Sequence, residues 1–337
     1  MSDNFRRTNP VLVITRAPLR VSFAGGGTDM EDFYRQDYGS VLSTTINKYV
    51  YITVKRHGRL FKENYRLNYA ETELAQDLDS IKNKIARECL RHVPVDLPVY
   101  ISTVGDVPSA SGLGSSSSFA VALLKGLHAM RGQRVSPAQL VDESTYVEID
   151  ILRHPIGKQD QAAAAYGGLN CFRFYADGSV TIEPHSPVHV DRLFKHTLIF
   201  WTGITRDATV VLSEQKRNVA SMMPYLKTMR DLAEELSRQV KNGMDIETFG
   251  KILDEGWRLK RKLASTITTD VIDSWYEKAK AAGALGGKLC GAGGGGFLLF
   301  VANPDRHEAI RRALSMLEVL DVTYEPNGAQ ILVSTSE

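Results

Sequence analysis

The sequence predicts an α+β protein built from two domains. At 337 residues the chain is longer than a single compact core usually requires. Its N-terminal third is rich in β-branched and aromatic runs, whereas residues 214–282 follow a mostly helical pattern. The last part alternates between strand and helix, as in a small α+β sandwich. We place the boundary near residue 190, between an N-terminal domain (residues 1–190) and a C-terminal domain (residues 191–337).

Strands dominate the first hundred residues. Four are predicted there, over residues 11–15, 19–24, 49–55 and 98–104. Pro18 separates the first two. A Gly/Ser-rich turn follows the fourth, and apolar residues at helical spacing predict a helix over residues 119–130. This part of the chain is therefore a strand, a glycine-rich loop and a helix in succession.

The remaining elements are mostly helical. A helix over residues 137–153 is expected because Ser136 can cap it, Pro137 suits its first turn and Pro155 stops it. In the long helical region, Pro224 and the Asn242–Gly243 pair are expected to mark interruptions.

The C-terminal part begins with a glycine-rich segment over residues 283–296. We expect a strand over residues 297–302 to follow it, then a helix to about Leu317 and a last strand over residues 331–334. These elements complete the predicted sandwich.

Composition narrows the functional classes. The chain is 43% hydrophobic and 24% charged with a net charge of +2, too balanced to indicate a nucleic-acid or membrane partner. The first ten residues are polar and basic rather than signal-like, and no apolar run approaches the roughly 18 residues that span a bilayer. Three widely spaced cysteines without a C-x-x-C pair argue against a disulfide framework or structural zinc site. We expect a cytoplasmic protein.

The strongest local signal is the glycine- and serine-rich segment at residues 108–118. Glycines let the backbone approach a ligand, and the start of the following helix offers unpaired N–H groups that favour a polyphosphate. Its serine hydroxyls can bind phosphate oxygens or a hard cation such as Mg²⁺. A lone segment of this kind is about as often a flexible turn with a serine cap. Two further clusters, at residues 25–29 and 291–296, lie against strand or helix patterns rather than in linkers.

Two common nucleotide motifs do not fit. Gly287-Lys288-Leu289 lacks the Ser/Thr and the upstream glycine of a P-loop. Residues 291–296 match G-x-G-x-x-G but lead into a predicted strand, whereas a dinucleotide fingerprint opens a helix. A Rossmann dehydrogenase is therefore disfavoured.

Together the three stretches resemble the motifs of the GHMP kinase superfamily, which includes galactokinase, homoserine kinase, mevalonate kinase and phosphomevalonate kinase. Residues 16–29 look like its first motif, residues 108–118 like its second and residues 288–297 like its third, in the family order. The resemblance implies a GHMP kinase fold: an N-terminal domain like domain 2 of ribosomal protein S5 and a C-terminal ferredoxin-like domain. ATP and substrate would bind between the two.

The resemblance also implies roles for single residues. The expected ATP phosphate-binding residues are Ser111, Gly112, Gly114, Ser115, Ser116 and Ser117. The expected Mg²⁺ ligands are Ser116 and Glu148, and the expected catalytic residues are Asp160 and Arg20. The expected substrate-binding residues are Gly27, Thr28, Asp29, Gly293, Gly294 and Arg206, with Lys48 and Arg16 as rivals of Arg206 for a distal phosphate. Outside this resemblance, a lone aspartate, arginine or glutamate is usually a solvated surface residue.

The first motif, Ala17 to Asp29, is similar to the branch that contains D-glycero-D-manno-heptose 7-phosphate kinases and fucokinases. This implies ATP- and Mg²⁺-dependent phosphorylation of the anomeric hydroxyl of a sugar phosphate, giving a 1,7-bisphosphate for nucleotide-activated heptose synthesis. A fucokinase or another free-sugar 1-kinase is the alternative within the class. A non-catalytic sensor of sugar or ATP is the alternative from another class. The expected partners are small molecules only, and a homodimer is one assembly that the sequence leaves open.

Overall fold

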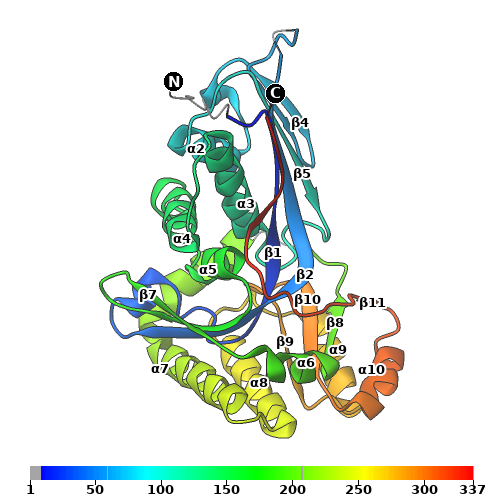
Figure 1. Ribbon diagram of the computed structural model, residues 1–337. Helices are drawn as coiled ribbons and strands as arrows, with labels where there is room; N and C mark the ends of the chain where they lie inside the picture. Colours follow the sequence, from blue (N-terminus) through cyan, green and yellow to red (C-terminus); the bar gives the residue numbers. More distant parts are fainter. Residues whose placement is uncertain (1–8, 59, 206–207, 337) are drawn as a thin grey trace.

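The computed structural model describes residues 9–58, 60–205 and 208–336 and confirms an α+β fold (Figure 1). Within these ranges the strands form one sheet of eight and one of four. The eight strands of the first sheet are β1 (Leu12–Ala24), β2 (Gly39–Arg56), β3 (Tyr65–Asn68), β4 (Thr72–Ala75), β5 (Val99–Gly105), β6 (Leu169–Phe174), β7 (Val180–Pro184) and β12 (Gln330–Thr335). The four strands of the second are β8 (Thr197–Trp201), β9 (Gly286–Leu289), β10 (Phe297–Val301) and β11 (Glu318–Val319).

The first sheet is organised around its longest strand, β2. Strand order along the main path is β12-β1-β2-β5-β3-β4, and β6 with β7 branches from β2. One end of β2 (residues 39–44) pairs with β6, and the other (residues 50–56) pairs with β5. The second sheet has the order β11-β8-β10-β9.

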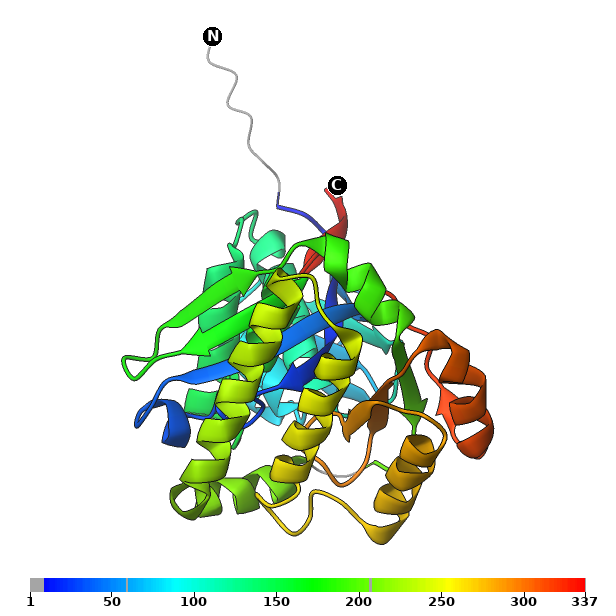
Figure 2. The same ribbon diagram turned by 90° about the horizontal axis from the view of Figure 1, so that it is seen from below.

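Helices cover both sheets, and one of them contacts strands of each. They are α1 (Glu31–Tyr34), α2 (Lys84–His92), α3 (Ser115–Met130), α4 (Pro137–Thr145), α5 (Gln159–Tyr166), α6 (Pro187–Lys195), α7 (Ala208–Lys241), α8 (Ile246–Lys260), α9 (Asp270–Ala281) and α10 (His307–Ala313). Helices α2 to α5 lie on one side of β1 and β2 (Figure 1), and α7 runs beside α8 beneath the molecule (Figure 2). None of the helices described here is both long enough and apolar enough to cross a membrane.

Three expectations about the elements were wrong. Residues 12–24 form one strand rather than two, because Pro18 lies at a register shift beyond the part of β1 that pairs with β12, where its missing N–H is tolerated. Pro224 lies inside α7 rather than ending a helix. The first helix after the glycine-rich loop begins at Ser115 rather than Phe119, since Gly114 takes the left-handed conformation directly before it (φ 79°).

The helix expected over residues 137–153 begins as predicted, with the hydroxyl of Ser136 accepting from the N–H of Gln139 at 3.2 Å. It then changes character, because Tyr146–Ile151 form a π-helical turn. Such turns are rare and occur frequently at functional sites.

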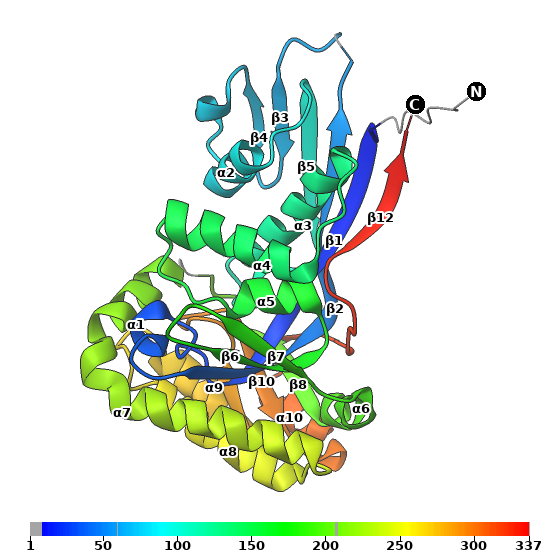
Figure 3. The same ribbon diagram turned by 60° about the vertical axis from the view of Figure 1, so that its left-hand side comes forward.

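The last strand lies in an unexpected place. Residues 331–334 do form a strand, but β12 pairs antiparallel with β1 in the first sheet instead of completing the C-terminal sandwich (Figure 3). Both ends of the described chain therefore meet side by side. The division near residue 190 stays a prediction, with this strand as its exception.

Candidate active site

A cavity of about 880 Å³ lies where the two sheets meet. Its wall includes Arg20 from β1, the start of α3, the start of α5, and the loop after β9. Ten predicted site residues line it: Arg20, Gly27, Asp29, Gly112, Gly114, Ser115, Ser116, Ser117, Asp160 and Gly293. The three glycine-rich stretches, far apart in the sequence, thus share one cavity.

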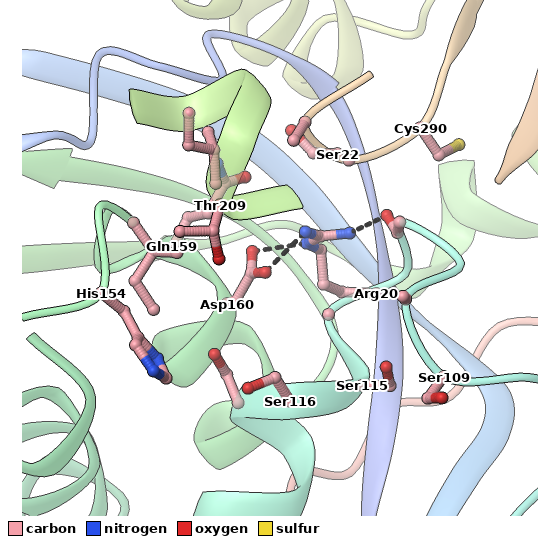
Figure 4. Close-up of a pocket in the computed structure, with 18 of the residues that line it drawn as sticks. Arg20, Ser22, Ser109, Ser115, Ser116, His154, Gln159, Asp160, Thr209 and Cys290 are labelled. Carbon is pink, nitrogen blue, oxygen red and sulfur yellow. Dashed lines mark hydrogen bonds and ion pairs between the residues drawn. The ribbon is translucent and has the colours of Figure 1, made fainter. Parts of the chain in front are cut away.

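Arg20 and Asp160 form a bidentate ion pair at the centre of the cavity (Figure 4). The guanidinium Nε lies 2.7 Å from one carboxylate oxygen of Asp160, and the second nitrogen lies 2.6 Å from the other. The third nitrogen of Arg20 donates to the carbonyl of Gly112 at 2.7 Å. Arg20 is only 5% exposed. One arginine therefore holds both the acidic side chain and the glycine-rich loop in place.

The loop before α3 presents the helix start to the cavity. Gly112 and Gly114 have positive φ values of 84° and 79°, which other residues rarely adopt. The first N–H groups of α3 have no acceptor within the helix, so this end favours an anion. Ser115, Ser116 and Ser117 line the cavity here. Ser111 lies behind the loop, where its buried hydroxyl has no hydrogen-bond partner in the described chain.

The second and third glycine-rich stretches contact each other through their backbones. A Cβ atom added to Gly291 would lie 2.4 Å from the Cα of Gly112, and one added to Gly296 would lie 2.3 Å from the carbonyl oxygen of Ser111. Only glycine, which has no Cβ, allows the two backbones to lie this close at both positions. The loop after β9 therefore closes directly onto the loop before α3.

Glu148 lies behind Ser116 and is fully buried. Its carboxylate accepts from the hydroxyl of Ser116 at 2.8 Å and from the side-chain amide of Gln161 at 2.7 Å. Burial raises the pKa of Glu148 to about 7. The π-helical turn carries this residue. A hydroxyl and a carboxylate oxygen next to a helix start that favours an anion suit a hard cation such as Mg²⁺.

Asp29 lies opposite, on the loop after β1. Its carboxylate accepts from the N–H of Gly27 at 2.9 Å and from the N–H of Gln159 at 3.3 Å. Burial raises the pKa of Asp29, and the nearby Asp160 carboxylate raises it further. A Cβ added to Gly157 would lie 2.0 Å from the Asp29 carboxylate, so Gly157 makes room for it.

The other predicted residues lie around the cavity or outside the described chain. Thr28 is buried and its hydroxyl donates to the carbonyls of Gly25 and Ser40, so it supports the loop. The N–H of Gly294 donates to Ile267 at 2.8 Å. Arg206 lies outside the described residues. Arg16 and Lys48, the other two candidates for a distal phosphate, do not line the cavity. Arg16 instead donates to the side chain of Gln330 at 2.9 Å.

Sequence reasoning missed two buried lysines, Lys260 at the end of α8 and Lys288 on β9. Lys288 donates to the carbonyls of Ser22 and Phe23 at 2.7 and 3.2 Å, which ties the second sheet to β1. Lys288 lies within the third motif and could have been found there. Lys260 ends an ordinary amphipathic helix, and no signal in a single sequence distinguishes it from a surface lysine.

Sequence reasoning also left the apolar wall of the cavity unassigned. Val50, Ile85, Val107 and Phe119 line it together with Tyr69. An apolar surface of this kind suits a planar base or ring.

Comparison with known proteins agrees with this geometry. Family models described as GHMP kinases N terminal domain and GHMP kinases C terminal match residues 80–168 and 229–317. A D-glycero-alpha-D-manno-heptose 7-phosphate kinase from Campylobacter jejuni is 30% identical over 335 residues, covering 94% of this chain and 97% of that protein. A bifunctional fucokinase/GDP-fucose pyrophosphorylase from Arabidopsis thaliana is 24% identical over 341 residues, covering 90% of this chain but only 31% of that protein.

A solved structure described as a D-glycero-D-manno-heptose 1-phosphate kinase from Bacteriodes thetaiotaomicron superposes with a TM-score of 0.79 at 25% identity. The match covers 96% of this chain and 100% of that one. The likeness therefore extends over both sheets and the cavity between them.

Proposed function

The chain belongs to the GHMP kinases, and from this premise we propose that it transfers the γ-phosphoryl group of ATP to the anomeric hydroxyl of a sugar 7-phosphate. The acceptor we propose is D-glycero-D-manno-heptose 7-phosphate, and the product is the 1,7-bisphosphate. The observation that carries this proposal is the Arg20–Asp160 pair, held in one cavity with Ser116 and Asp29, with Glu148 bonded behind Ser116. The heptose phosphate kinase among the relatives supports the choice of sugar.

The proposed ATP site lies along the start of α3 and the apolar wall of the cavity. The triphosphate would lie at the start of α3, where backbone N–H groups and the serine hydroxyls meet negative charge. The purine would lie against the apolar wall near Val50 and Phe119. Ser116 and Glu148 would hold Mg²⁺, which offsets charge on the phosphates.

The acceptor would lie between Asp29 and Asp160. Asp29 would accept hydrogen bonds from sugar hydroxyls, and Asp160 would orient the anomeric hydroxyl toward the γ-phosphorus. A bond forms between the anomeric oxygen and the γ-phosphorus, the bond from the γ-phosphorus to the bridging oxygen breaks, and ADP leaves. The hydroxyl proton passes to the Asp160 carboxylate and then to solvent. Arg20 places positive charge beside the migrating group.

A free-sugar 1-kinase such as a fucokinase is the second candidate, supported by the bifunctional fucokinase among the relatives. A non-catalytic sensor is less well supported, because it would not need the full set of predicted catalytic and metal-binding residues. This chain has that set, with Arg20 bonded to Asp160 and Ser116 bonded to Glu148. The two kinase candidates differ in whether a second phosphate must be bound.

The test is a phosphorus NMR assay of the purified protein with Mg-ATP and a panel of free sugars and sugar phosphates. We expect a new anomeric phosphate signal with heptose 7-phosphate, and we expect Asp160→Ala to abolish it. Turnover of free sugars alone would replace the proposed acceptor. Nucleotide binding without turnover of any acceptor would instead favour a sensor.

A further inference from the structure

The ammonium of Lys260 lies inside the cavity without a carboxylate to match its charge. Lys260 is 6% exposed, and its Nζ donates to the carbonyl of Gly291. Within the described part of the chain, no Asp or Glu forms a salt bridge with it. An ammonium has three donors, and burying its charge unpaired is costly. Such a cost is often retained where the charge has a function.

The neighbouring cations are already engaged. Arg20 pairs with Asp160, and Lys288 donates to two backbone carbonyls. Burial, with the charges of Lys288 and then Arg20, lowers the pKa of Lys260 to about 7, whereas Cys290 and Asp29 oppose the shift. Burial also lowers the pKa of Lys288 to about 8. An incoming anion would relieve this crowding of positive charge.

Lys260 contacts the loop after β9 and has Asp29 as an electrostatic neighbour. In Figure 4, Ser22 and Gln159 lie on one side of the Arg20–Asp160 pair, and Ser115 and Ser116 lie on the other. The carbonyl of Ser22 accepts from Lys288, and the N–H of Gln159 donates to Asp29. Lys288 and Asp29 are both electrostatic neighbours of Lys260. The chain just after Lys260 also lies beside the loop that carries Asp29, since a Cβ added to Gly27 would lie 4.0 Å from the side chain of Leu263. Lys260 therefore lies between this loop and the contact of Gly291 with Gly112.

We propose that Lys260 binds the phosphate group that the acceptor sugar already carries, and so makes the enzyme select phosphorylated sugars. This inference rests on the proposed function and specifies its acceptor. The ammonium would exchange part of its contact with Gly291 for a charge-assisted hydrogen bond to phosphate, which is among the stronger polar contacts. Because the phosphate is an anion, it also favours the protonated form of the lysine.

The experiment compares Lys260→Met with Lys262→Met. Methionine keeps the length of the side chain and removes its charge, and replacing an unpaired buried charge by an apolar group is seldom destabilising. Lys262 lies two residues further along the chain, exposed, with its ammonium 5.0 Å from the ring of Tyr225. Lys260→Gln serves as a second variant if the methionine variant fails to fold. Calorimetry without ATP measures binding of heptose 7-phosphate and of the unphosphorylated heptose, and steady-state kinetics measure KM and kcat.

We expect Lys260→Met to weaken binding of heptose 7-phosphate, and to raise its KM, by ten- to a hundredfold. The KM for ATP should change less than threefold, binding of the free heptose should stay the same, and Lys262→Met should behave like the wild type. Unchanged binding of heptose 7-phosphate in Lys260→Met would overturn the inference. So would a fall in kcat at constant KM, which would place Lys260 on the migrating phosphoryl group.

The same data separate this inference from the proposed function. If the wild-type protein phosphorylates none of the sugars, the proposed function fails, while the calorimetry still decides whether Lys260 recognises a sugar phosphate. If the wild type binds and phosphorylates only free sugars, the inference about Lys260 fails and the kinase stands.

Discussion

The contact between the two glycine-rich loops predicts a large effect for Gly291→Ala. The Cβ atom would lie 2.4 Å from the Cα of Gly112 and 2.8 Å from its carbonyl oxygen. Both positions are backbone, so no side chain can rotate away. Since ordinary contacts begin near 3.4 Å, the loops must separate by about 1 Å. The carbonyl of Gly112 also accepts from Arg20, and the shift would reach the ion pair with Asp160.

A displacement of about 1 Å in reacting groups costs on the order of a hundredfold in rate. We therefore expect kcat/KM for ATP to fall about a hundredfold in Gly291→Ala. The left-handed conformation adds roughly 1–2 kcal/mol of strain, since Gly291 has a φ of 70°. The backbone shift that removes the clash should lower the free energy of unfolding by at least about 1 kcal/mol more, as at other overpacked sites.

The matched control is Gly203→Ala. Gly203 has nearly the same φ, 71°, but a Cβ added there meets no atom of the described chain within 4 Å. It should show the strain without the clash, so kcat/KM for ATP should change less than about threefold. An ADP-release assay and urea denaturation measure both effects. Equal losses in the two variants would refute the argument that loop contact, rather than backbone strain, makes Gly291 necessary.

Three further predictions concern the carboxylate of Asp160, the buried Glu148 and the last strand. Asp160→Asn should lower kcat by about 10²–10⁴-fold, because the amide cannot take the proton, and an ADP-release assay with less than a tenfold loss would contradict this. Burial raises the pKa of Glu148 from 4.5 to about 7. Between these pH values the native state holds a proton that the unfolded state has lost. The free energy of unfolding therefore falls as pH rises. In magnesium-free buffer, Glu148→Gln should therefore raise the free energy of unfolding by about 3 kcal/mol at pH 8 and by less than about 1 kcal/mol at pH 5. A gain that does not depend on pH would show that it does not come from the titration of Glu148. Removing residues 329–337 exposes the edge of β1 and should lower the Tm by roughly 5–10 °C in a calorimetric scan, whereas an unchanged Tm would mean that the pairing of β12 with β1 contributes little.

Much of the fold was predictable from local pattern. The helix after the Gly/Ser-rich loop, the capped helix at Ser136 and the strand over residues 297–301 all depend on nearby residues. The continuity of β1 and the place of the last strand were missed because distant partners decide them. Pro18 is accommodated because β12, from the other end of the chain, pairs only with residues 12–16 of β1. Local propensity carries no information about that partner.

The candidate site shows the same division. Its glycine-rich loops, Asp160 and Arg20 were expected from motifs, although their roles stay predictions until tested. Nothing in the sequence indicated that Gly291 would contact Gly112. The family resemblance did imply that Arg20 lies beside Asp160, 140 positions away, but the bidentate geometry of the pair came only from the structure.

The sequence alone therefore determined the α+β class, the kinase family and the glycine-rich segments that line the cavity, because short-range spacing encodes glycine turns, helix starts and motif order. Only the tertiary structure decided which loops touch, that Glu148 lies buried behind Ser116 and that Lys260 is a buried charge in the cavity. The physical reason is that burial and pairing depend on groups brought together by folding. The same lysine or glutamate is an ordinary solvated residue in a linear chain, and it acquires a shifted pKa and a specific partner only inside the cavity.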